Sequence, residues 1–509
     1  MAKPRRSKMM SLKLPFLLTL FLALSQAQPH SDDPPPPPSS NVCVIGAGIG
    51  GSSVAHFLRK YSPSSTPSTK IRVFERNGRV GGRIATVTVA GETFEAGASI
   101  LHPKNLHTVD YVKILKLKVK EPTASEDSLS LGIWDGNKFV FKTVSPLSST
   151  VPLIDKLLKL PFGIKLEFSH GFKLLKNKKC SQSASIAVDK FVKYYEDPGS
   201  RPIFETVDEM LQWAGLYNLT TRTLRDELVD AGLSTSLINE LVTVITRINY
   251  GQSVSMSGLG GVVSLAGSGG GLWSIEGGNW QMAAGLINQS DVALHLHEEI
   301  KSVADLGDYY ELNSTKGNSY RCEVAVVATP LDELDIQFIP PISIPERKLQ
   351  HTFTTFVRGL LNPAYFGLKA VTKIPDLVGT IEDPELPFSC IAVLKKHNEK
   401  ESTYKLFSRQ PMADTLLDSI FSVRKETIRI NWAAYPHYHA PEVFAPFILD
   451  GRHLYYVNAF ENAASTMETS AVAAENIARL ILSRYFGQVI VHSSNLSASS
   501  QGEGTHLDL

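Results

Sequence analysis

The sequence predicts an α/β fold in which a doubly wound parallel sheet is interrupted by an inserted α+β domain. Three observations predict it. The apolar run Val42–Ile45 leads directly into a glycine-rich turn and then into a helical pattern. A second apolar strand, Lys70–Phe74, ends at the acidic residue Glu75. Amphipathic helical patterns fill the region from about 120 to 250, after which strand patterns resume.

The turn after the first strand has the spacing Gly46-x-Gly48-x-x-Gly51, with Ala47 between the first two glycines. In Rossmann-like folds one glycine makes the tight turn, one lets the backbone approach a pyrophosphate, and one lets the helix pack close to the strand. The helix predicted at Ser52–Tyr61 would offer free N–H groups to the phosphates. The motif is weak alone, but its flanking strand and helix support a dinucleotide site.

Residues beyond the second strand indicate which dinucleotide binds. Glu75 can accept hydrogen bonds from ribose hydroxyls, although it falls later than this pattern usually places it, and Arg76 follows. Gly81-Gly82-Arg83 would then place a guanidinium beside the pyrophosphate, where bidentate pairing is strong. Because a cofactor limited to nicotinamide does not need this arginine, the sequence predicts FAD.

Patterns of the nucleotide-binding fold return after the insertion. Val292–Val303 and Arg452–Phe460 are each predicted as a strand, Glu323–Thr329 contains a buried strand, and Ala463–Tyr485 is predicted as a closing helix. Helices of the insertion are expected at Thr206–Leu216 and Ser234–Ile248, with lysines and leucines interleaved at Ile154–Leu175. The predicted organisation is a leader at 1–27, a proline-rich linker at 28–40, an FAD-binding domain at 41–118, 280–335 and 450–487, a substrate domain at 119–279 and 336–449, and a flexible tail at 488–509.

The leader has the features of a secretory signal peptide. A basic start precedes the apolar run Leu14–Leu24, and Ser25 and Ala27 are small enough for cleavage. The run is short for a membrane span, so an uncleaved anchor is the weaker alternative. Entry into the secretory pathway makes N-glycosylation an expectation, and the acceptor sequences lie at Asn218, Asn288, Asn313 and Asn495.

Charge and cysteine content exclude other classes of partner. Removing the five basic residues of the leader from the total of 51 leaves 46 basic residues against 50 acidic ones, a net charge of −4. This balance argues against a nucleic-acid partner. No pair among the four cysteines has metal-ligand spacing, so no metal site is predicted. Cys43 and Cys322 lie in apolar runs and are expected to be buried thiols.

Longer motifs make the chain similar to the prenylcysteine oxidase family, and within it to the plant farnesylcysteine lyases. They are Gly97–Leu106, Asn249–Val254, Gly271–Asn279 and Asn458–Glu461, and together with the dinucleotide motifs they extend over nearly all of the chain beyond the leader. The resemblance implies an amine-oxidase-like architecture and an FAD-dependent thioether oxidase. The implied reaction cleaves S-farnesylcysteine with O2 and water to cysteine, a prenyl aldehyde and hydrogen peroxide. The implied compartment is a lysosome or vacuole, and a peripheral membrane association is left open.

The chemistry that the resemblance implies gives a role to few side chains. Loss of hydride from the allylic carbon beside sulfur needs no protein base, because the cofactor carries the difficult step. No residue is therefore predicted to be catalytic. Gly97 and Ala98 would let backbone pass close to a flat flavin ring. Substrate contacts are expected from His102 and Lys104 near the cysteine end and from Asn279 and Trp280 near the flavin.

One segment departs from the pattern of related flavoproteins. Those proteins carry glycines around the C-terminal flavin contact, whereas this chain has Glu461-Asn462-Ala463-Ala464-Ser465 followed by Thr466 and Met467. Glu461 can still meet the pyrophosphate region. Flavin contacts from Thr466 and Met467 stay open.

Two other classes of function share this predicted fold. An amine or polyamine oxidase would oxidise a carbon beside nitrogen instead of sulfur. A non-enzymatic escort protein would bind prenyl groups without redox chemistry. The intact Glu75 and Gly81-Gly82-Arg83 favour an enzyme, and the leader disfavours a cytosolic escort. A flavin spectrum separates the escort from the oxidases, and peroxide release with prenylcysteine or polyamine separates the two oxidases.

Overall fold

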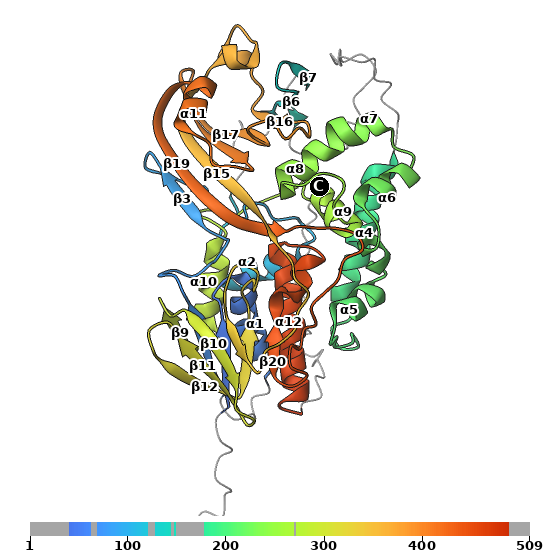
Figure 1. Cartoon of the computed structure of the whole chain (residues 1–509), viewed down its shortest axis with the longest axis vertical. Coiled ribbons are helices and arrows are strands. Elements are labelled where there is room, and N and C mark those ends of the chain that lie inside the picture. Colours follow the sequence, from blue (N-terminus) through green and yellow to red (C-terminus); the bar gives the residue numbers. More distant parts are fainter. Residues whose placement is uncertain are drawn as a thin grey trace, which may run out of the picture. The chain divides into compact units, whose positions relative to one another are not determined.

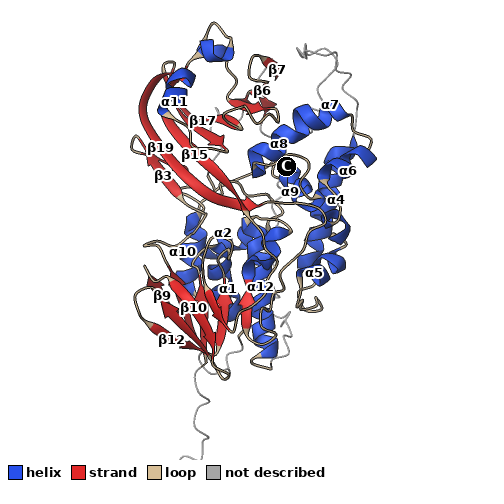
Figure 2. Cartoon of the chain, in the orientation of Figure 1, coloured by secondary structure: helices blue, strands red, loops and turns tan. Residues whose placement is uncertain are grey.

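The computed structural model describes residues 40–62, 69–120, 128–143, 147–148, 178–268 and 271–487. Figure 1 labels its elements along the chain, and Figure 2 colours them by type. The predicted signal peptide, the linker before Ser40, the segment Ile154–Leu175, the acceptor Asn495 and the tail at 488–509 lie outside the described residues.

A five-stranded parallel sheet forms the nucleotide-binding part of the fold, in the order β20–β13–β1–β2–β9 (Figure 1). Its central strand is buried from Val42 to Ile45 because neighbours cover both faces, which explains the continuous apolar run. Helices α1 and α12 pack together beside the sheet. The bounds are β1 (Asn41–Ile45), β2 (Lys70–Glu75), β9 (Val292–Leu296), β13 (Val324–Val327), β20 (Leu454–Tyr456), α1 (Ile49–Tyr61) and α12 (Met467–Arg484).

Two predicted strands are wrong in extent. Val292–Val303 is divided at His297, whose φ of 56° turns the chain out of β9 and into β10. Arg452–Phe460 contains only three strand residues, because β20 follows β13 from Leu454 to Tyr456 and the chain then enters a 3₁₀ turn at Val457–Asn462. That turn carries Glu461 towards the interior, where it is buried.

A second, four-stranded sheet packs its apolar residues into the same core, in the order β12–β11–β10–β14. It consists of β10 (Ile300–Asp305), β11 (Tyr310–Ser314), β12 (Ser319–Cys322) and β14 (Gln337–Ile339). Strand β14 pairs with β10 in parallel. The predicted domain boundaries stay predictions.

A seven-stranded sheet, in the order β19–β15–β18–β17–β16–β6–β7, belongs to the region predicted as the substrate domain (Figure 2). Its two longest strands pair antiparallel, and the hairpin β3–β4 packs on them through Val89, Ala96 and Phe356. The bounds are β3 (Thr86–Val89), β4 (Glu92–Glu95), β6 (Leu131–Trp134), β7 (Phe139–Lys142), β15 (Leu349–Leu361), β16 (Leu377–Thr380), β17 (Cys390–Asn398), β18 (Glu401–Ser408) and β19 (Phe421–Pro436), and the short strands β5 (Ser128–Leu129) and β8 (Leu147–Ser148) pair separately.

Helices make up the rest of the insertion. The helix predicted at Thr206–Leu216 is confirmed as α5, with a capping box at Thr206 and a left-handed Gly215 at its end. The helix predicted at Ser234–Ile248 is confirmed as α7 and α8, joined by a π-helical turn at Ile238–Val242. The bounds are α2 (Leu106–Leu115), α4 (Lys178–Glu196), α5 (Val207–Ala214), α6 (Leu224–Asp230), α7 (Thr235–Leu237), α8 (Thr243–Tyr250), α9 (Gly258–Ala266), α10 (Trp280–Gln289) and α11 (Asp414–Ile420).

The prediction of buried free thiols at Cys43 and Cys322 is wrong. Cys43 and Cys322 form a buried disulfide instead of two thiols, with their Cα atoms 5.8 Å apart. Pairing of β1 with β13 explains it, because Val42 faces Val324 and so brings the end of β12 beside Cys43. Cys390 is a buried free thiol.

The described part of the chain contains no helix long and apolar enough to cross a membrane. It also contains no cluster of three or more histidine, cysteine or acidic side chains that could hold a metal ion.

Candidate active site

The three glycines of the first turn have separate structural roles. Gly46 has a φ of +108°, and a Cβ there would lie 2.6 Å from the carbonyl oxygen of Ala328. A Cβ on Gly51 would lie 2.0 Å from the carbonyl oxygen of Gly46, so only glycine lets α1 approach the turn. A Cβ on Gly48 would meet only the carbonyl oxygen of Gly81, at 3.8 Å. Gly48 therefore borders open space at the N-terminus of α1, where no side chain caps the free N–H groups.

Glu75 lies directly beside this turn. Its carboxylate is buried and accepts hydrogen bonds from the backbone N–H of Ala47 at 3.0 Å and from both nitrogens of Asn77 at 2.8 and 2.9 Å. The acidic side chain at the tip of β2 is thus fixed across from the glycine turn, as a ribose-binding carboxylate would be. Arg76, the next residue, is exposed.

Gly81 and Gly82 bring a second loop against the turn. The N–H of Gly81 donates to the carbonyl oxygen of Ala47 at 3.0 Å. Gly82 has a φ of +57°, and a Cβ there would lie close to the Cα of Gly48. Arg83 follows and donates to the carbonyl oxygen of Ala434 at 2.8 Å. The arginine therefore lies between the nucleotide-binding turn and the end of β19.

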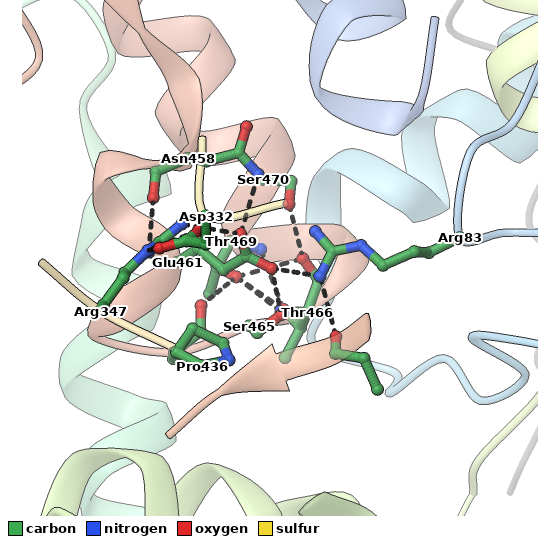
Figure 3. A network of polar contacts seen from close by, with 12 residues as sticks. Arg83, Asp332, Arg347, Pro436, Asn458, Glu461, Ser465, Thr466, Thr469 and Ser470 are labelled. Carbon is green, nitrogen blue, oxygen red and sulfur yellow. Dashed lines mark hydrogen bonds and ion pairs between the residues drawn. The ribbon is translucent and has the colours of Figure 1, made fainter. Parts of the chain in front are cut away.

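Glu461 is the centre of a buried ionic network (Figure 3). It pairs with Arg83 and with Arg347, whose nearest nitrogen is 3.5 Å away, and accepts hydrogen bonds from Asn458 at 2.8 Å and Ser465 at 3.0 Å. Burial opposes ionisation, but the two arginines outweigh it and lower the pKa of Glu461 to about 2. The carboxylate is therefore ionised under all ordinary conditions and orients Arg83.

The strip from Glu95 to Ala98 is held by side chains on both sides. The carbonyl oxygens of Glu95, Ala96 and Ala98 accept hydrogen bonds from Lys405 at 3.0 Å, Trp432 at 3.1 Å and Asn279 at 3.2 Å, respectively. Its N–H groups donate to the carbonyl oxygens of Arg83 and Ala85. A Cβ on Gly97 would lie 1.9 Å from the carbonyl oxygen of Arg83, so only glycine fits at this position.

Asn279 and Trp280 make contacts within the protein, and their predicted substrate contacts stay predictions. The side chain of Asn279 is fully buried. Its amide nitrogen donates to the carbonyl oxygen of Ala98, and its amide oxygen accepts the N–H of Ile275 at 3.0 Å. The Trp280 indole donates to the carbonyl oxygen of Gly277 at 3.2 Å, and its Cβ packs near Gly81. Neither residue lines either of the two cavities described below, and Asn279 positions the strip.

Two connected cavities open over the strip. The first, called here the arginine cavity, encloses about 880 Å³ of empty space, and its lining includes Arg83, Arg247 and Arg409. The second, called here the apolar cavity, encloses about 1530 Å³ among the helices, and its lining includes Phe191, Leu211, Leu259, Val262 and Phe460. Both volumes include space open to solvent. The residues common to both linings are Gly97, Ala98, Ile248, Phe407, Tyr435, Ser465, Thr466 and Met467.

His102 and Lys104 line the apolar cavity, as a substrate contact requires. Burial, assisted by the charge of Lys104, lowers the pKa of His102, so its ring is neutral at neutral pH. Its Nδ1 accepts the N–H of Lys104 at 3.1 Å. The ammonium of Lys104 pairs with Asp189 of α4. Whether either residue binds substrate stays a prediction.

Thr466 and Met467 also reach the site despite the absence of glycines. Thr466 caps α12 by accepting the N–H of Thr469 at 2.9 Å, and both Thr466 and Met467 line both cavities. The positive end of an 18-residue helix is therefore directed at the junction of the cavities.

Several residues of the site were missed from the sequence. Three of them, Arg347, Lys405 and Trp432, contact segments far away in the chain, and none belongs to a motif. The sequence could have drawn attention only to Lys405, because it is the one basic residue in a strand whose residues are mostly buried.

Sequence comparisons identify the family. The profile described as "Prenylcysteine lyase" matches residues 157–492, and one described as "NAD(P)-binding Rossmann-like domain" matches residues 44–115. The chain is 61% identical to "Farnesylcysteine lyase" of Arabidopsis thaliana over 464 residues, which is 91% of this chain and 92% of that protein. The chain belongs to the prenylcysteine lyase family. Another similar protein is "Prenylcysteine oxidase 1" of Homo sapiens, at 33% identity over 92% of this chain and 94% of that one.

Solved structures show the same fold as this prenylcysteine lyase family member. "Cyclohexylamine Oxidase from Brevibacterium oxydans" superposes with a TM-score of 0.58 at 16% identity, over 88% of this chain and 100% of that one. A putrescine oxidase bound to putrescine superposes with a TM-score of 0.55 at 12% identity, over 88% and 99%. The predicted family, the amine-oxidase-like fold class and FAD as cofactor are thus confirmed.

The residues present fit FAD. Gly48 leaves open space beside free helix N–H groups, Glu75 is fixed beside the turn, and Arg83 directly follows the two glycines that pack against the turn. Gly97 and Ala98 of the strip line both cavities. Which atoms of the cofactor each residue contacts stays a prediction.

Proposed function

We propose that this protein oxidises the thioether of S-prenylcysteine, with S-farnesylcysteine as the preferred substrate. The observation that supports it best is the apolar cavity, which joins the arginine cavity at the held strip. Burial of each methylene contributes on the order of 0.8 kcal/mol, so a cavity lined by aliphatic and aromatic side chains favours a long prenyl tail. Membership of the prenylcysteine lyase family supports the same substrate class.

The proposed reaction combines S-farnesylcysteine, O2 and water to give farnesal, cysteine and hydrogen peroxide. The bond between sulfur and the allylic carbon breaks, the carbon gains the oxygen of water, and O2 takes the two electrons and two protons. FAD, when bound, supplies the two-electron oxidation of that carbon.

The protein contributes position and a dry environment. The reacting centre would lie against the strip from Glu95 to Ala98. Hydrogen bonds from Lys405, Trp432 and Asn279 hold this strip and limit the conformational freedom of its backbone. Leucine, valine and phenylalanine side chains exclude water from the prenyl tail.

The structure favours this activity over polyamine oxidation. Among the described residues that line the arginine cavity none is acidic, and three are arginines. A polyamine is a multiple cation, and the carboxylates that pair with these arginines, Glu461 and Glu382, do not line the cavity, so the cavity offers it no carboxylate. Among the described residues that line the apolar cavity, Glu468 is the one acidic side chain, and it already accepts three hydrogen bonds from His107, Thr108 and Tyr195.

Anaerobic reduction tests the proposal. FAD-loaded protein is mixed with S-farnesylcysteine, S-decylcysteine or spermine, and flavin absorbance is followed. We expect bleaching with S-farnesylcysteine alone, because the saturated thioether lacks the allylic double bond that stabilises the developing cation. Peroxide should appear when air is admitted. Bleaching by spermine but not by S-farnesylcysteine would favour the amine oxidase, and purification without flavin would favour the escort protein.

We further propose that the protein matures in the secretory pathway and works in a lysosome or vacuole. The leader supports this, and so does the Cys43–Cys322 disulfide, since such bonds persist mainly in oxidising compartments. Asn218 and Asn288 are exposed and suit glycosylation, whereas Asn313 lies half-buried in β11 with its amide donating to Ser302 and Glu311. A peripheral membrane association is part of the proposal, because the substrate carries a lipid.

A further inference from the structure

We infer that the arginine cavity binds the cysteine end of the substrate and that Arg409 recognises its α-carboxylate. The inference rests on the proposed function and goes beyond it by assigning the two ends of the substrate to the two cavities. A prenylcysteine has an apolar tail on one side of sulfur and a charged amino acid on the other. The two cavities differ in the same sense and meet at the held strip.

Among its described lining residues, the arginine cavity has basic side chains and no acidic ones. Arg409 pairs with both oxygens of Glu382 at 2.7 and 2.8 Å, and Arg247 pairs with the same carboxylate at 3.1 Å. Glu382 and its neighbour Asp383 do not line the cavity, whereas both arginines do. A guanidinium has five N–H donors, and Arg409 uses two of them on Glu382. The remaining donors can bind a carboxylate.

Arg247 fixes this arrangement from the protein side. Its side chain is 1% exposed, and its Nη1 donates to the carbonyl oxygens of Thr380, at 3.0 Å, and Ile381. Burial is the main influence on Arg247 and lowers its pKa to about 10, so it stays charged at neutral pH. Arg409, in contrast, is 36% exposed, directly follows the last residue of β18, and lines the cavity. Arg247 therefore positions Glu382, and Arg409 is the arginine available to a ligand.

A second observation marks the same cavity as a polar binding site. Thr354 is fully buried and lines the arginine cavity, and its Oγ1 has no hydrogen-bond partner among the described residues. A buried hydroxyl without a partner costs free energy unless a ligand or water completes it. The ammonium or carboxylate of an amino acid is a suitable partner.

The rival position for the cysteine end is the His102–Lys104 corner of the apolar cavity. There the ammonium of Lys104 is already paired with Asp189, and His102 is neutral. That corner thus has no surplus positive charge, whereas two arginines share one carboxylate in the arginine cavity. The charge balance favours the arginine cavity.

Binding of a non-oxidisable analogue tests the inference independently of turnover. The probes are S-(hexahydrofarnesyl)cysteine and its methyl ester, titrated by calorimetry into FAD-loaded wild-type protein and into Arg409→Gln, Arg409→Lys and Lys104→Gln. The matched control is Arg424→Gln, because Arg424 pairs with Asp414 and Asp418 outside both cavities. Flavin content shows that each variant is folded.

We expect the wild type to bind the acid more tightly than the ester, and Arg409→Gln to weaken binding of the acid by about ten- to a hundredfold with little effect on the ester. Arg409→Lys should restore part of the preference, and Lys104→Gln and Arg424→Gln should retain it. Loss of the preference in Lys104→Gln but not in Arg409→Gln would overturn the inference, as would equal weakening of acid and ester in Arg409→Gln. If the wild type shows the Arg409-dependent preference but does not oxidise S-farnesylcysteine, the proposed function fails while the assignment of this cavity stands.

Discussion

Replacing Gly48 with alanine should weaken FAD binding while leaving the apoprotein as stable as the wild type. Gly48 has a φ of −75°, which alanine adopts without strain, and the added Cβ would meet only the carbonyl oxygen of Gly81 at 3.8 Å. Such a contact is ordinary, so the free energy of unfolding of the apoprotein should change by no more than about 0.5 kcal/mol. The methyl group instead enters the space that the pyrophosphate needs.

The loss of cofactor has a calculable effect on stability. At a free FAD concentration of one hundred times the dissociation constant, binding stabilises the wild type by about 2.7 kcal/mol. If alanine weakens binding about a hundredfold, the same concentration stabilises the variant by only about 0.4 kcal/mol. Denaturant unfolding with and without FAD measures both values, and the ratio of flavin to protein absorbance after gel filtration measures retention.

Gly51→Ala is the matched control. Its Cβ would lie 2.0 Å from the carbonyl oxygen of Gly46, so backbone must move, and the apoprotein itself should lose about 1–3 kcal/mol or more. The two glycines thus separate cofactor binding from folding. A Gly48→Ala protein that keeps a full complement of flavin would refute the assignment of this turn to the pyrophosphate.

Three further predictions concern stability and maturation. The pKa of Glu461 falls from 4.5 to about 2 on folding, so its stabilisation is complete above pH 4.5 and is lost as the pH falls towards 2; acid titration should show wild type losing about 3 kcal/mol more than Glu461→Gln. Cys43→Ser should lower the free energy of unfolding by about 2–5 kcal/mol, and Cys322→Ser should match it, whereas no loss in either would contradict the disulfide. In cells, glycosidase should increase the mobility of the secretory form, and Asn218→Gln together with Asn288→Gln should abolish most of that shift; a protein that retains residues 1–27 and never shifts would contradict secretion.

Local patterns predicted the parts of the site that are contiguous in the chain. The turn at Gly46–Gly51 was found because β1 is buried on both faces and the glycines have fixed spacing after it. Glu75 and Arg83 follow within the same supersecondary unit. Gly97 was found from a run of small residues, and its Cβ would overlap the carbonyl oxygen of Arg83, which is why no larger residue fits.

Contacts between distant segments could not be predicted in this way. The disulfide joins cysteines 279 residues apart, and only the pairing of β1 with β13 makes them neighbours. Arg347 reaches Glu461 from a loop that has no motif. Asn279 lies in a motif, but nothing in the sequence reveals that its side-chain amide donates to the carbonyl oxygen of Ala98.

The site is assembled so that charge and apolar surface meet at one rigid strip. Arg83 and Glu461 come from opposite ends of the chain and are paired in the interior, which ties the nucleotide-binding turn to the segment that starts α12. That segment lines both cavities, and so does Tyr435 at the end of β19. A substrate that is charged at one end and apolar at the other can therefore be oriented by the difference between the cavities alone. Orientation of this kind needs no base beside the reacting carbon, which agrees with a reaction whose difficult step belongs to the cofactor.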